Sequence, residues 1–397
     1  MDMEEQYMLR AIELAKRGIG RVNPNPLVGA VIVKEGNIIA EGYHARYGEL
    51  HAERHAFSKL ADPEEARGTE MYVTLEPCCH HGKQPPCTQA IIDHGIRKVY
   101  VGSDDPNALV AGQGIALLRE AGIEVETQVM KEACDKLNPV FFHYITKRTP
   151  YVVMKYAMTL DGKLACDNGR SRWVTGERAR AHVQETRNAL TGIMVGIGTV
   201  LADNPSLTCR MPGGRNPVRI IVDSRLRIPL ESQIVQTAKE VPTIVAATEA
   251  YNSFNDGECN ASARDKRDIV EEGKSAKIDK RQALEEMGVK ILSVPHSESD
   301  AENRVNLKLL MEMLGREGID GILLEGGSTL NQSALWAGIV QKLQVYIAPK
   351  IFGGGGSFTP VRGVGVEDPS EAFFCCNRRI TDFGEDILLE YDVKEMR

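Results

Sequence analysis

The feature that most constrains this chain is a double series of short apolar segments, divided at Arg148-Thr149-Pro150. In each series, short apolar runs alternate with stretches of helical periodicity, which is typical of a layered α/β domain. The chain has 397 residues, and single hydrophobic cores stop growing well below that length. We therefore predict two α/β domains, residues 1–148 and 149–397.

The first series opens with a helix in which Tyr7, Ala11 and Leu14 recur at helical spacing. It ends before Asn23-Pro24-Asn25-Pro26, because proline cannot continue a helix. The pattern predicts an opening hairpin followed by mainly parallel strands. The predicted strands are 28–33, 38–43, 71–75, 98–102 and 123–128, and the later helices are 51–60, 87–94, 114–121 and 131–147.

The second series is longer and contains one polar interruption. Asn255 to Lys280 is charged and has little apolar periodicity, so we interpret it as a surface insertion. The predicted strands are 151–157, 193–196, 218–223, 243–247, 290–294 and 321–325, and the helices are 178–190, 306–314 and 329–337.

Two fragments of the first domain carry metal-binding side chains. His51-Ala52-Glu53 opens a predicted helix, and Pro77-Cys78 begins a loop that ends at Cys87. One imidazole and two thiolates suit zinc and leave a fourth position open for a water molecule, whose pKa the ion lowers. Hydrolytic deamination also needs a carboxylate that moves protons. We therefore predict a zinc site of His51, Cys78 and Cys87, with Glu53 as the catalytic proton shuttle.

The spacing leaves two alternatives open. Cys79 is a rival to Cys78, although Cys78 directly follows the proline, as in the His-x-Glu…Pro-Cys-x-x-Cys signature of zinc nucleobase deaminases. The second cysteine here lies nine residues on, farther than in that signature. A closed structural site would instead take Cys79, His80 or His81 as a fourth ligand, but it would have no need of Glu53.

Together with these fragments, Asn25-Pro26-Leu27-Val28-Gly29-Ala30 and Pro-Cys-x-His-x-Gly-Lys-x-Pro-Pro-Cys at 77–87 resemble the deaminase half of the bifunctional deaminase/reductase family of riboflavin biosynthesis. The resemblance implies a cytidine-deaminase-like α/β/α fold. It implies a diaminopyrimidinone substrate that carries ribosylamine 5-phosphate and exchanges its 2-amino group for oxygen. By matching position, the implied substrate contacts are Asn25, His44, His80 and Lys83. Taken alone, Lys83 is better interpreted as a solvated loop charge, but within this motif we favour the substrate contact.

In the second domain, Gly196-Ile197-Gly198-Thr199 and Gly326-Gly327-Ser328-Thr329 follow predicted strands. Backbone N–H groups at such turns and at helix N-termini favour phosphate groups. Each fragment alone is equally compatible with a plain tight turn, and neither is the Gly-x-Gly-x-x-Gly motif. With Leu160-Asp161-Gly162-Lys163 and Ser171-Arg172-Trp173-Val174-Thr175, they resemble the reductase half of the same family.

This second resemblance implies a dihydrofolate-reductase-like fold, a homo-oligomer, and hydride transfer from NADPH to C1 of the opened ribosylamine. Two alternatives stay open, namely Arg187 as a helix-surface charge and Trp173 as a core aromatic. The implied NADPH contacts are Ala157, Trp173, Thr199, Asp203, Ser224, Gly327, Ser328, Thr329, Leu330, Asn331, Gln332 and Ser333. The implied substrate contacts are Ser171, Arg187, Leu207, Arg210 and Glu325.

Charge and composition decide between classes of function. The net charge is −7, of which residues 1–148 carry −4, and this disfavours a deaminase that acts on a base in RNA, which would need a basic groove. A non-catalytic, zinc-stabilised binding protein is a further alternative, but it would not need Glu53. Nine cysteines without a secretory signal pattern or a membrane-length apolar run favour a cytoplasmic protein with reduced thiols. We expect a two-step enzyme with zinc and NADPH.

Overall fold

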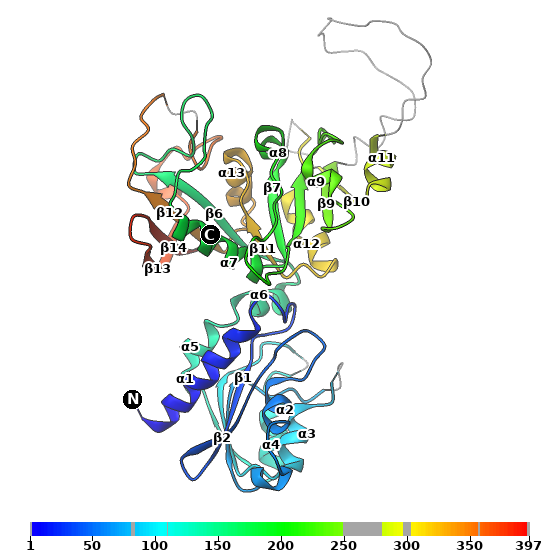
Figure 1. Cartoon of the computed structure of the whole chain (residues 1–397), viewed down its shortest axis with the longest axis vertical. Coiled ribbons are helices and arrows are strands. Elements are labelled where there is room, and N and C mark those ends of the chain that lie inside the picture. The colour runs from blue at the N-terminus through cyan, green and yellow to red at the C-terminus, as the bar shows by residue number, and fades with distance from the viewer. Residues whose placement is uncertain are drawn as a thin grey trace, which may run out of the picture. The chain divides into compact units, whose positions relative to one another are not determined.

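The computed structural model describes residues 2–80, 84–108, 110–248, 280–296, 303–355 and 358–394. The chain forms two compact units (Figure 1), of which unit 1 comprises Met1–Tyr151 and Gly315–Gly321, and unit 2 comprises Val152–Leu314 and Ile322–Arg397. The remote segment joins unit 1 because Asp320 accepts hydrogen bonds from the Tyr151 backbone N–H (2.8 Å) and the Asn23 amide (2.7 Å). The predicted insertion, apart from Lys280, lies outside the described residues.

Unit 1 is built on a five-stranded sheet of order β2-β1-β3-β4-β5. Strand β1 pairs antiparallel with β2 and β3, whereas β3, β4 and β5 are parallel, as the sequence predicts. The strands are β1 (Gly29–Lys34), β2 (Asn37–Tyr43), β3 (Glu70–Leu75), β4 (Lys98–Ser103) and β5 (Glu124–Thr127). The helices are α1 (Met3–Ala15), α2 (Ala52–Phe57), α3 (Cys87–Asp93), α4 (Gln113–Glu120), α5 (Lys131–Asp135) and α6 (Pro139–Lys147), with short 3₁₀ turns at Lys16–Gly18 and Pro63–Ala66.

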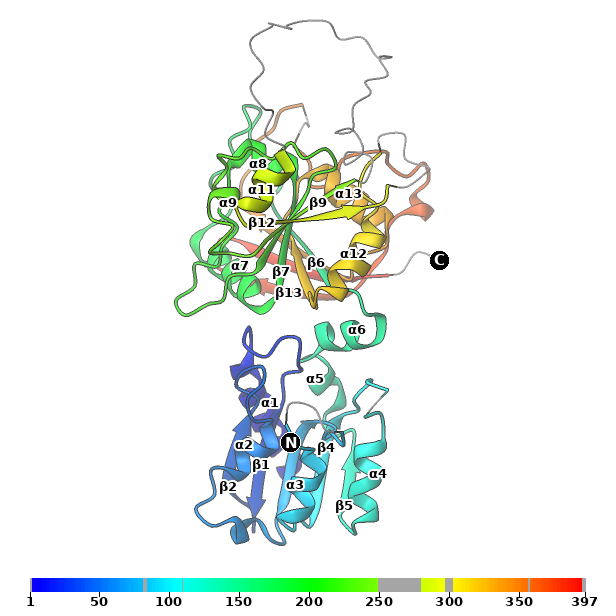
Figure 2. The same cartoon turned by 90° about the vertical axis from the view of Figure 1, so that its right-hand side faces the viewer.

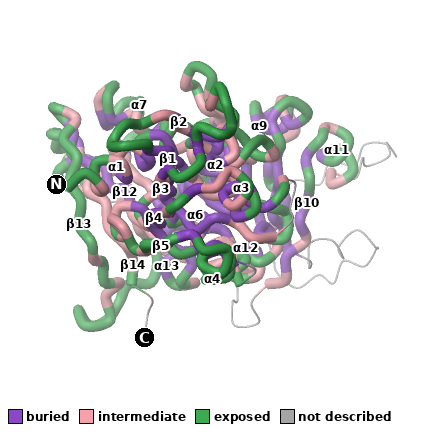
Figure 3. The backbone as a smooth tube through the Cα atoms, turned by 90° about the horizontal axis from the view of Figure 1, so that it is seen from below, coloured by how far each residue is buried: buried purple, intermediate pink, exposed green. Residues whose placement is uncertain are grey.

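Alternate residues of β1 point into two separate cores, because side chains alternate along a strand. Ala30 and Ile32 pack with residues of α2, α3 and α4, whereas Val31 and Val33 pack with residues of α1 and α5. The central strands β1, β3 and β4 are almost fully buried (purple in Figure 3). Unit 1 is therefore a three-layer α/β/α domain.

The single helix predicted over 131–147 is wrong. It is divided into α5 and α6, with Pro139 as the first residue of α6 and Asn138 in a non-helical conformation before it. A proline disfavours helical geometry in the residue that precedes it. The buried Asn138 side chain instead pairs with both the backbone N–H and the carbonyl of Leu27.

Unit 2 is built on a nine-stranded sheet of order β10-β9-β8-β7-β11-β6-β12-β14-β13. The strands are β6 (Tyr151–Thr159), β7 (Gly192–Gly196), β8 (Val218–Val222), β9 (Thr243–Thr248), β10 (Val289–Val294), β11 (Gly321–Leu324), β12 (Lys342–Ala348), β13 (Cys375–Asp382) and β14 (Ile387–Val393). The helices are α7 (Glu177–Ala189), α8 (Ile197–Asp203), α9 (Gln233–Gln236), α11 (Lys280–Glu286), α12 (Leu307–Arg316) and α13 (Ser328–Trp336), with a 3₁₀ turn at Pro369–Glu371.

Most neighbouring strands of unit 2 run parallel, but the C-terminal hairpin of β13 and β14 adds an antiparallel edge to β12. Helices α8, α9 and α11 bury apolar residues against β7, β8 and β9, and Figure 2 shows these helices on one side of the sheet. Helix α7 packs through Ala179 and Val183 against Tyr346 of β12 and Leu388 of β14. Within the described ranges, no helix combines the length and the hydropathy needed to cross a bilayer.

Candidate functional site

Three metal-binding side chains of unit 1 converge beyond the carboxyl end of β3. His51 immediately precedes α2, Cys78 lies three residues after β3, and Cys87 is the first residue of α3. Their ligand atoms lie within 4.8 Å of one another, with the His51 Nδ1 3.5 Å from the Cys78 Sγ and 3.4 Å from the Cys87 Sγ. Two thiols and one imidazole fit zinc, and three ligands leave one coordination position open.

The rival ligands do not join this cluster. Cys79 and His80 are described but do not belong to the group of three, and His81 lies outside the described residues. Hydrogen bonding with the Cys87 thiol and with His51 holds the pKa of Cys78 at about 4 despite burial, whereas burial raises the pKa of Cys79. The geometry decides for Cys78, because its Sγ lies with the ligand atoms of His51 and Cys87 and that of Cys79 does not.

Glu53 lies beside this cluster as the second residue of α2 and is only 3% exposed. Burial raises the pKa of its carboxyl group, and the neighbouring Cys78 thiolate raises it further. Its side chain lines the same cavity as His51 and Cys78. A carboxyl group with a raised pKa can accept a proton and return it near neutral pH.

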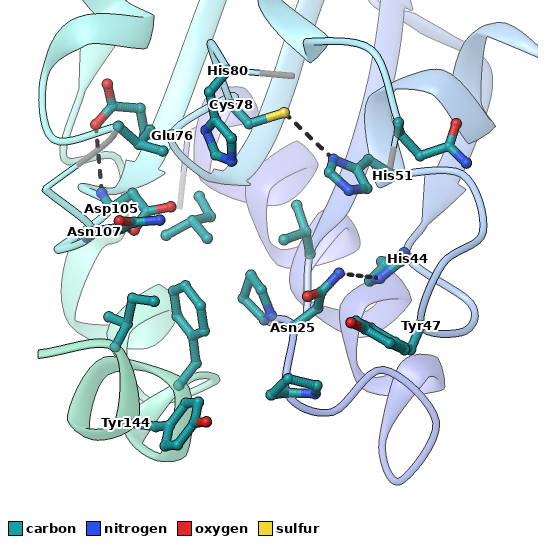
Figure 4. Close-up of a pocket in the computed structure, with 18 of the residues that line it drawn as sticks. Asn25, His44, Tyr47, His51, Glu76, Cys78, His80, Asp105, Asn107 and Tyr144 are labelled. Carbon is teal, nitrogen blue, oxygen red and sulfur yellow. Dashed lines mark hydrogen bonds between the residues drawn. The ribbon is translucent and has the colours of Figure 1, made fainter. Parts of the chain in front are cut away.

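The cavity has a volume of about 440 Å³ and is lined entirely by residues of unit 1. Asn25 and His44 lie on one wall (Figure 4), with the Asn25 amide nitrogen 3.2 Å from the His44 Nε2. The His44 ring stands edge-on to that of His51 at 5.3 Å, and burial lowers the pKa of His44. His80 also lines the cavity, and its buried Nδ1 has no partner among the described atoms. Lys83 lies outside the described residues.

Two further walls of this cavity were not predicted from the sequence. Asp105, Asn107 and Val110 come from the segment that follows β4, and Phe141 and Tyr144 come from α6. The signal was present for the first wall, because β3 and β4 are parallel neighbours whose carboxyl ends meet at one edge of the sheet. The second wall could not be predicted, because Phe141 and Tyr144 reach the cavity only when the chain turns at Pro139. The prediction of a single helix over 131–147 does not contain that turn.

In unit 2, Arg187 and Glu325 form a buried ion pair between α7 and the end of β11. The two hydrogen bonds measure 2.9 and 2.8 Å, and the side chains are 11% and 12% exposed. Burial alone would raise the pKa of Glu325, but the charges of Arg187 and Lys155 outweigh it and hold the pKa at about 2. The alternative interpretation of Arg187 as a helix-surface charge is therefore wrong.

Arg187 also holds the segment that contains Leu207 and Arg210, two of the predicted substrate contacts. Its guanidinium donates to the Thr208 carbonyl in that segment at 2.9 Å. Leu207 is buried beside Thr208 and has a left-handed backbone. The backbone N–H of Arg210 donates to the side chain of Gln184 of α7 at 2.9 Å, and the Arg210 charge also lowers the pKa of Glu325.

Lys155 of β6 is a charged neighbour of this pair that the sequence analysis missed. Burial lowers the pKa of its ammonium group, which Glu325 opposes, and its Nζ lies 5.7 Å from the centre of the Tyr346 ring. The signal was a single lysine inside the apolar run Val152-Val153-Met154-Lys155-Tyr156, because an unpaired lysine is rarely found in a buried strand.

The predicted cofactor residues of unit 2 gather where two glycine-containing turns meet. A Cβ atom on Gly326 would lie 3.3 Å from the Gly196 backbone nitrogen, and one on Gly327 would lie 3.6 Å from the Thr199 Oγ1. These turns open α8 and α13. Two neighbouring helix N-termini that begin at glycines fit a cofactor that carries phosphate groups.

The segment before α7 lies next to this region. Arg172 donates to the carbonyl of Asp203 at 3.5 Å, the Trp173 carbonyl accepts from Lys350 at 2.9 Å, and the Arg180 guanidinium lies 4.5 Å from the centre of the Trp173 ring. Trp173 is 58% exposed, so its interpretation as a core aromatic is wrong. Ser171 immediately precedes Arg172 in this segment, and Ala157 lies in β6.

Three of the side chains predicted to contact NADPH form hydrogen bonds with another part of unit 2. Ser328 donates to the Thr359 carbonyl, Asn331 to Pro360 (2.9 Å) and Gln332 to Val364 (2.9 Å). These bonds hold the segment 359–364 against α13. Ser224 lies outside this group, and its hydroxyl accepts from the Val305 backbone N–H at 3.1 Å.

Comparison with known proteins assigns both halves of the chain. Residues 1–103 match the model of the cytidine and deoxycytidylate deaminase zinc-binding region, and residues 150–389 match that of the RibD C-terminal domain. The riboflavin biosynthesis protein RibD of Actinobacillus pleuropneumoniae is 49% identical over 98% of this chain and 94% of its own length. The chain belongs to the RibD family. The RibD of Escherichia coli is 38% identical, over 88% of this chain and 89% of its own.

Solved RibD structures share the whole architecture. The Acinetobacter baumannii RibD has a TM-score of 0.81 at 32% identity and covers 99% of both chains. A Thermotoga maritima protein described as a diaminohydroxyphosphoribosylaminopyrimidine deaminase/5-amino-6-(5-phosphoribosylamino)uracil reductase has a TM-score of 0.79 at 37% identity and the same coverage. These RibD matches confirm the expected fold class.

Proposed function

We propose that the chain carries out two steps of riboflavin biosynthesis. Unit 1 deaminates 2,5-diamino-6-(5-phosphoribosylamino)pyrimidin-4(3H)-one by hydrolysis, and unit 2 reduces the ribosyl group of the resulting uracil to ribityl. The observation that carries the proposal is the cluster of His51, Cys78 and Cys87, with Glu53 in the same cavity. Membership of the RibD family supports both steps.

In unit 1, zinc held by His51, Cys78 and Cys87 would lower the pKa of a water molecule at the open position. Glu53 would carry two protons in turn, one from the attacking water to the ring nitrogen and one from the hydroxyl formed by the attack to the amino group that leaves as ammonia. Burial suits Glu53 to this task, because it raises the pKa of the carboxyl toward the working pH. Asn25 and His44 lie where they can bind the edge of the base.

In unit 2, NADPH would supply the hydride for C1 of the opened ribosylamine, placed by the turns at Gly196 and Gly327. Arg187 and Arg210 would donate hydrogen bonds to the substrate phosphate or to its sugar hydroxyls. Lys155 is the group best suited to donate a proton during ring opening, because burial lowers the pKa of its ammonium group. Preference for NADPH over NADH, a homo-oligomeric state and a cytoplasmic location are the finer parts of this proposal.

A pair of variants separates the two steps within one chain. Glu53→Gln should lower the rate of ammonia release about 100-fold or more, because it removes only the proton carrier, while reduction of the deaminated intermediate continues. Lys155→Gln should do the reverse. Ammonia release by Glu53→Gln at the wild-type rate would contradict the role of Glu53, and unchanged NADPH oxidation by Lys155→Gln would contradict that of Lys155.

A further inference from the structure

Glu76 is a buried carboxylate that neither of the proposed reactions uses. It follows β3 directly, two residues before the predicted zinc ligand Cys78, and is 3% exposed. Its Oε1 accepts hydrogen bonds from the backbone N–H groups of Gly114 (3.0 Å) and Ile115 (3.2 Å). Its Oε2 accepts from those of Gly112 (3.0 Å) and Asp105 (3.5 Å).

These four donors belong to two structures. Gly114 and Ile115 lie in the first turn of α4. The N-cap residue of this helix is Gly112, which has no side chain to accept hydrogen bonds from the N–H groups of that turn. Glu76 therefore replaces the missing cap, and its charge suits a helix N-terminus. Asp105 and Gly112 bracket the segment between β4 and α4, so the same carboxylate also closes that segment into a loop.

The closed loop is one wall of the deaminase cavity. Asp105, Asn107 and Val110 line the cavity, and Figure 4 shows Asp105 and Asn107 beside Glu76, across the cavity from Asn25 and His44. Within the loop, the Asn107 N–H donates to the Asp105 carboxylate at 2.8 Å. The wall thus presents the carboxyl group of Asp105 and the carboxamide group of Asn107 to the cavity. The positions of both groups depend on the backbone that Glu76 holds.

We propose that Glu76 is a positioning residue of the deaminase site, which sets the distance between the 105–110 wall and the zinc-binding side. This inference rests on the proposed function of unit 1. Glu76 does not belong to the group of zinc-binding side chains. It lines the cavity at this wall, but its two carboxylate oxygens are occupied by the four backbone N–H groups, so we expect it to act on substrate binding through the wall that it holds. Glu76 is also joined to Cys78 through Pro77 alone, so a short piece of chain connects the wall to the zinc-binding side.

The hydrogen-bond pattern explains why the isosteric amide cannot replace it. Each carboxylate oxygen of Glu76 serves two N–H donors. In Glu76→Gln one oxygen becomes an NH₂ group, which cannot accept, so two backbone donors lose their partner. The N–H groups of Gly114 and Ile115 lie in the first turn of α4, where no intrahelical acceptor is available, so we expect the amide oxygen to stay with them. The NH₂ group then faces Gly112 and Asp105, and the loop between them is the part that moves.

The test measures KM and kcat for ammonia release by Glu76→Gln, together with zinc content and NADPH oxidation on the deaminated intermediate. We expect KM to rise about tenfold, kcat to stay within about threefold, and zinc content and reduction to match the wild type. Glu70→Gln is the matched control, since Glu70 is a carboxylate of the same strand that pairs with Arg97 at the opposite end. It should leave KM unchanged.

Glu76→Asp keeps the charge but shortens the side chain, and it should give a smaller rise in KM; it decides the question if the amide variant does not fold. A lower unfolding midpoint with unchanged KM would make Glu76 a purely structural residue and overturn the inference. Loss of zinc from Glu76→Gln would also overturn it. If the wild type itself releases no ammonia, the proposed function fails instead.

Discussion

At the scale of single residues, the unit 1 site depends on which thiol faces the metal. Cys78 and Cys79 are neighbours in sequence, but only the Cys78 Sγ lies with His51 and Cys87. The signature proline before Cys78 predicts the same choice.

Serine substitutions test this choice directly. Cys78→Ser should lose zinc, because a hydroxyl is a poor ligand for zinc beside two softer donors, and ammonia release should fall with it. Cys79→Ser, as the matched control, should keep the zinc content and kcat of the wild type within about twofold. Metal analysis and the ammonia assay measure both, and loss of zinc from Cys79→Ser alone would show that the ligand is Cys79.

The buried pair of Arg187 and Glu325 predicts a stability effect in unit 2. The substitution Glu325→Gln should lower the free energy of unfolding of unit 2 by about 3 kcal/mol at pH 7, because the buried Arg187 guanidinium then has no counter-ion. Urea titration followed by tryptophan fluorescence measures this, since both tryptophans, Trp173 and Trp336, lie in unit 2. Glu64→Gln, in an exposed pair of unit 1, should leave that signal unchanged.

The same pair predicts how the stability of unit 2 depends on pH. The pKa of Glu325 is about 2 in the folded chain against an ordinary value of 4.5. Because the folded pKa is the lower one, the stabilisation is complete above about pH 4.5 and is lost as the pH falls toward about 2. The difference between wild type and Glu325→Gln should narrow over that range, and a constant difference would contradict the ion-pair account.

At the scale of elements, the interface between α1 and β1 leaves no room for a side chain at Gly29. A Cβ atom there would lie 1.9 Å from the Ala11 carbonyl oxygen and 2.9 Å from the Ala15 nitrogen. Gly29→Ala should therefore destabilise unit 1 by about 3 kcal/mol. Far-UV circular dichroism should show an earlier transition while tryptophan fluorescence keeps its midpoint. Gly198→Ala, with no atom within 4 Å, is the control and should not destabilise.

Local patterns predict elements well where a segment carries its own signal. The predicted strand 28–33 is β1 at Gly29–Lys34, and the predicted helix 329–337 is α13 at Ser328–Trp336. The C-terminal hairpin escaped prediction because β13 is exposed along most of its length and so lacks an alternating apolar face. The break at Pro139 was missed because the apolar periodicity continues on both sides of it.

At the scale of the whole molecule, the two sites lie in separate units and draw on different parts of the chain. Motifs predict residues that are close in sequence, such as His51 and Glu53. They do not show that Asp105, Tyr144 or Lys155 line or adjoin a site, because strand order and helix packing bring these residues there. The Glu325 side chain meets Arg187 across 138 positions of sequence. The resemblance implied only that both residues contact the substrate, and no local pattern predicts that they pair.

The most direct test of the central claim is a coupled assay on the intact chain with the phosphoribosyl diaminopyrimidinone, before and after zinc removal by a chelator. We expect ammonia release followed by NADPH oxidation in the untreated protein. After chelation ammonia release should stop, while the chain still oxidises NADPH when given the deaminated intermediate, and added zinc should restore the first step. Undiminished ammonia release by the zinc-free protein would contradict the account.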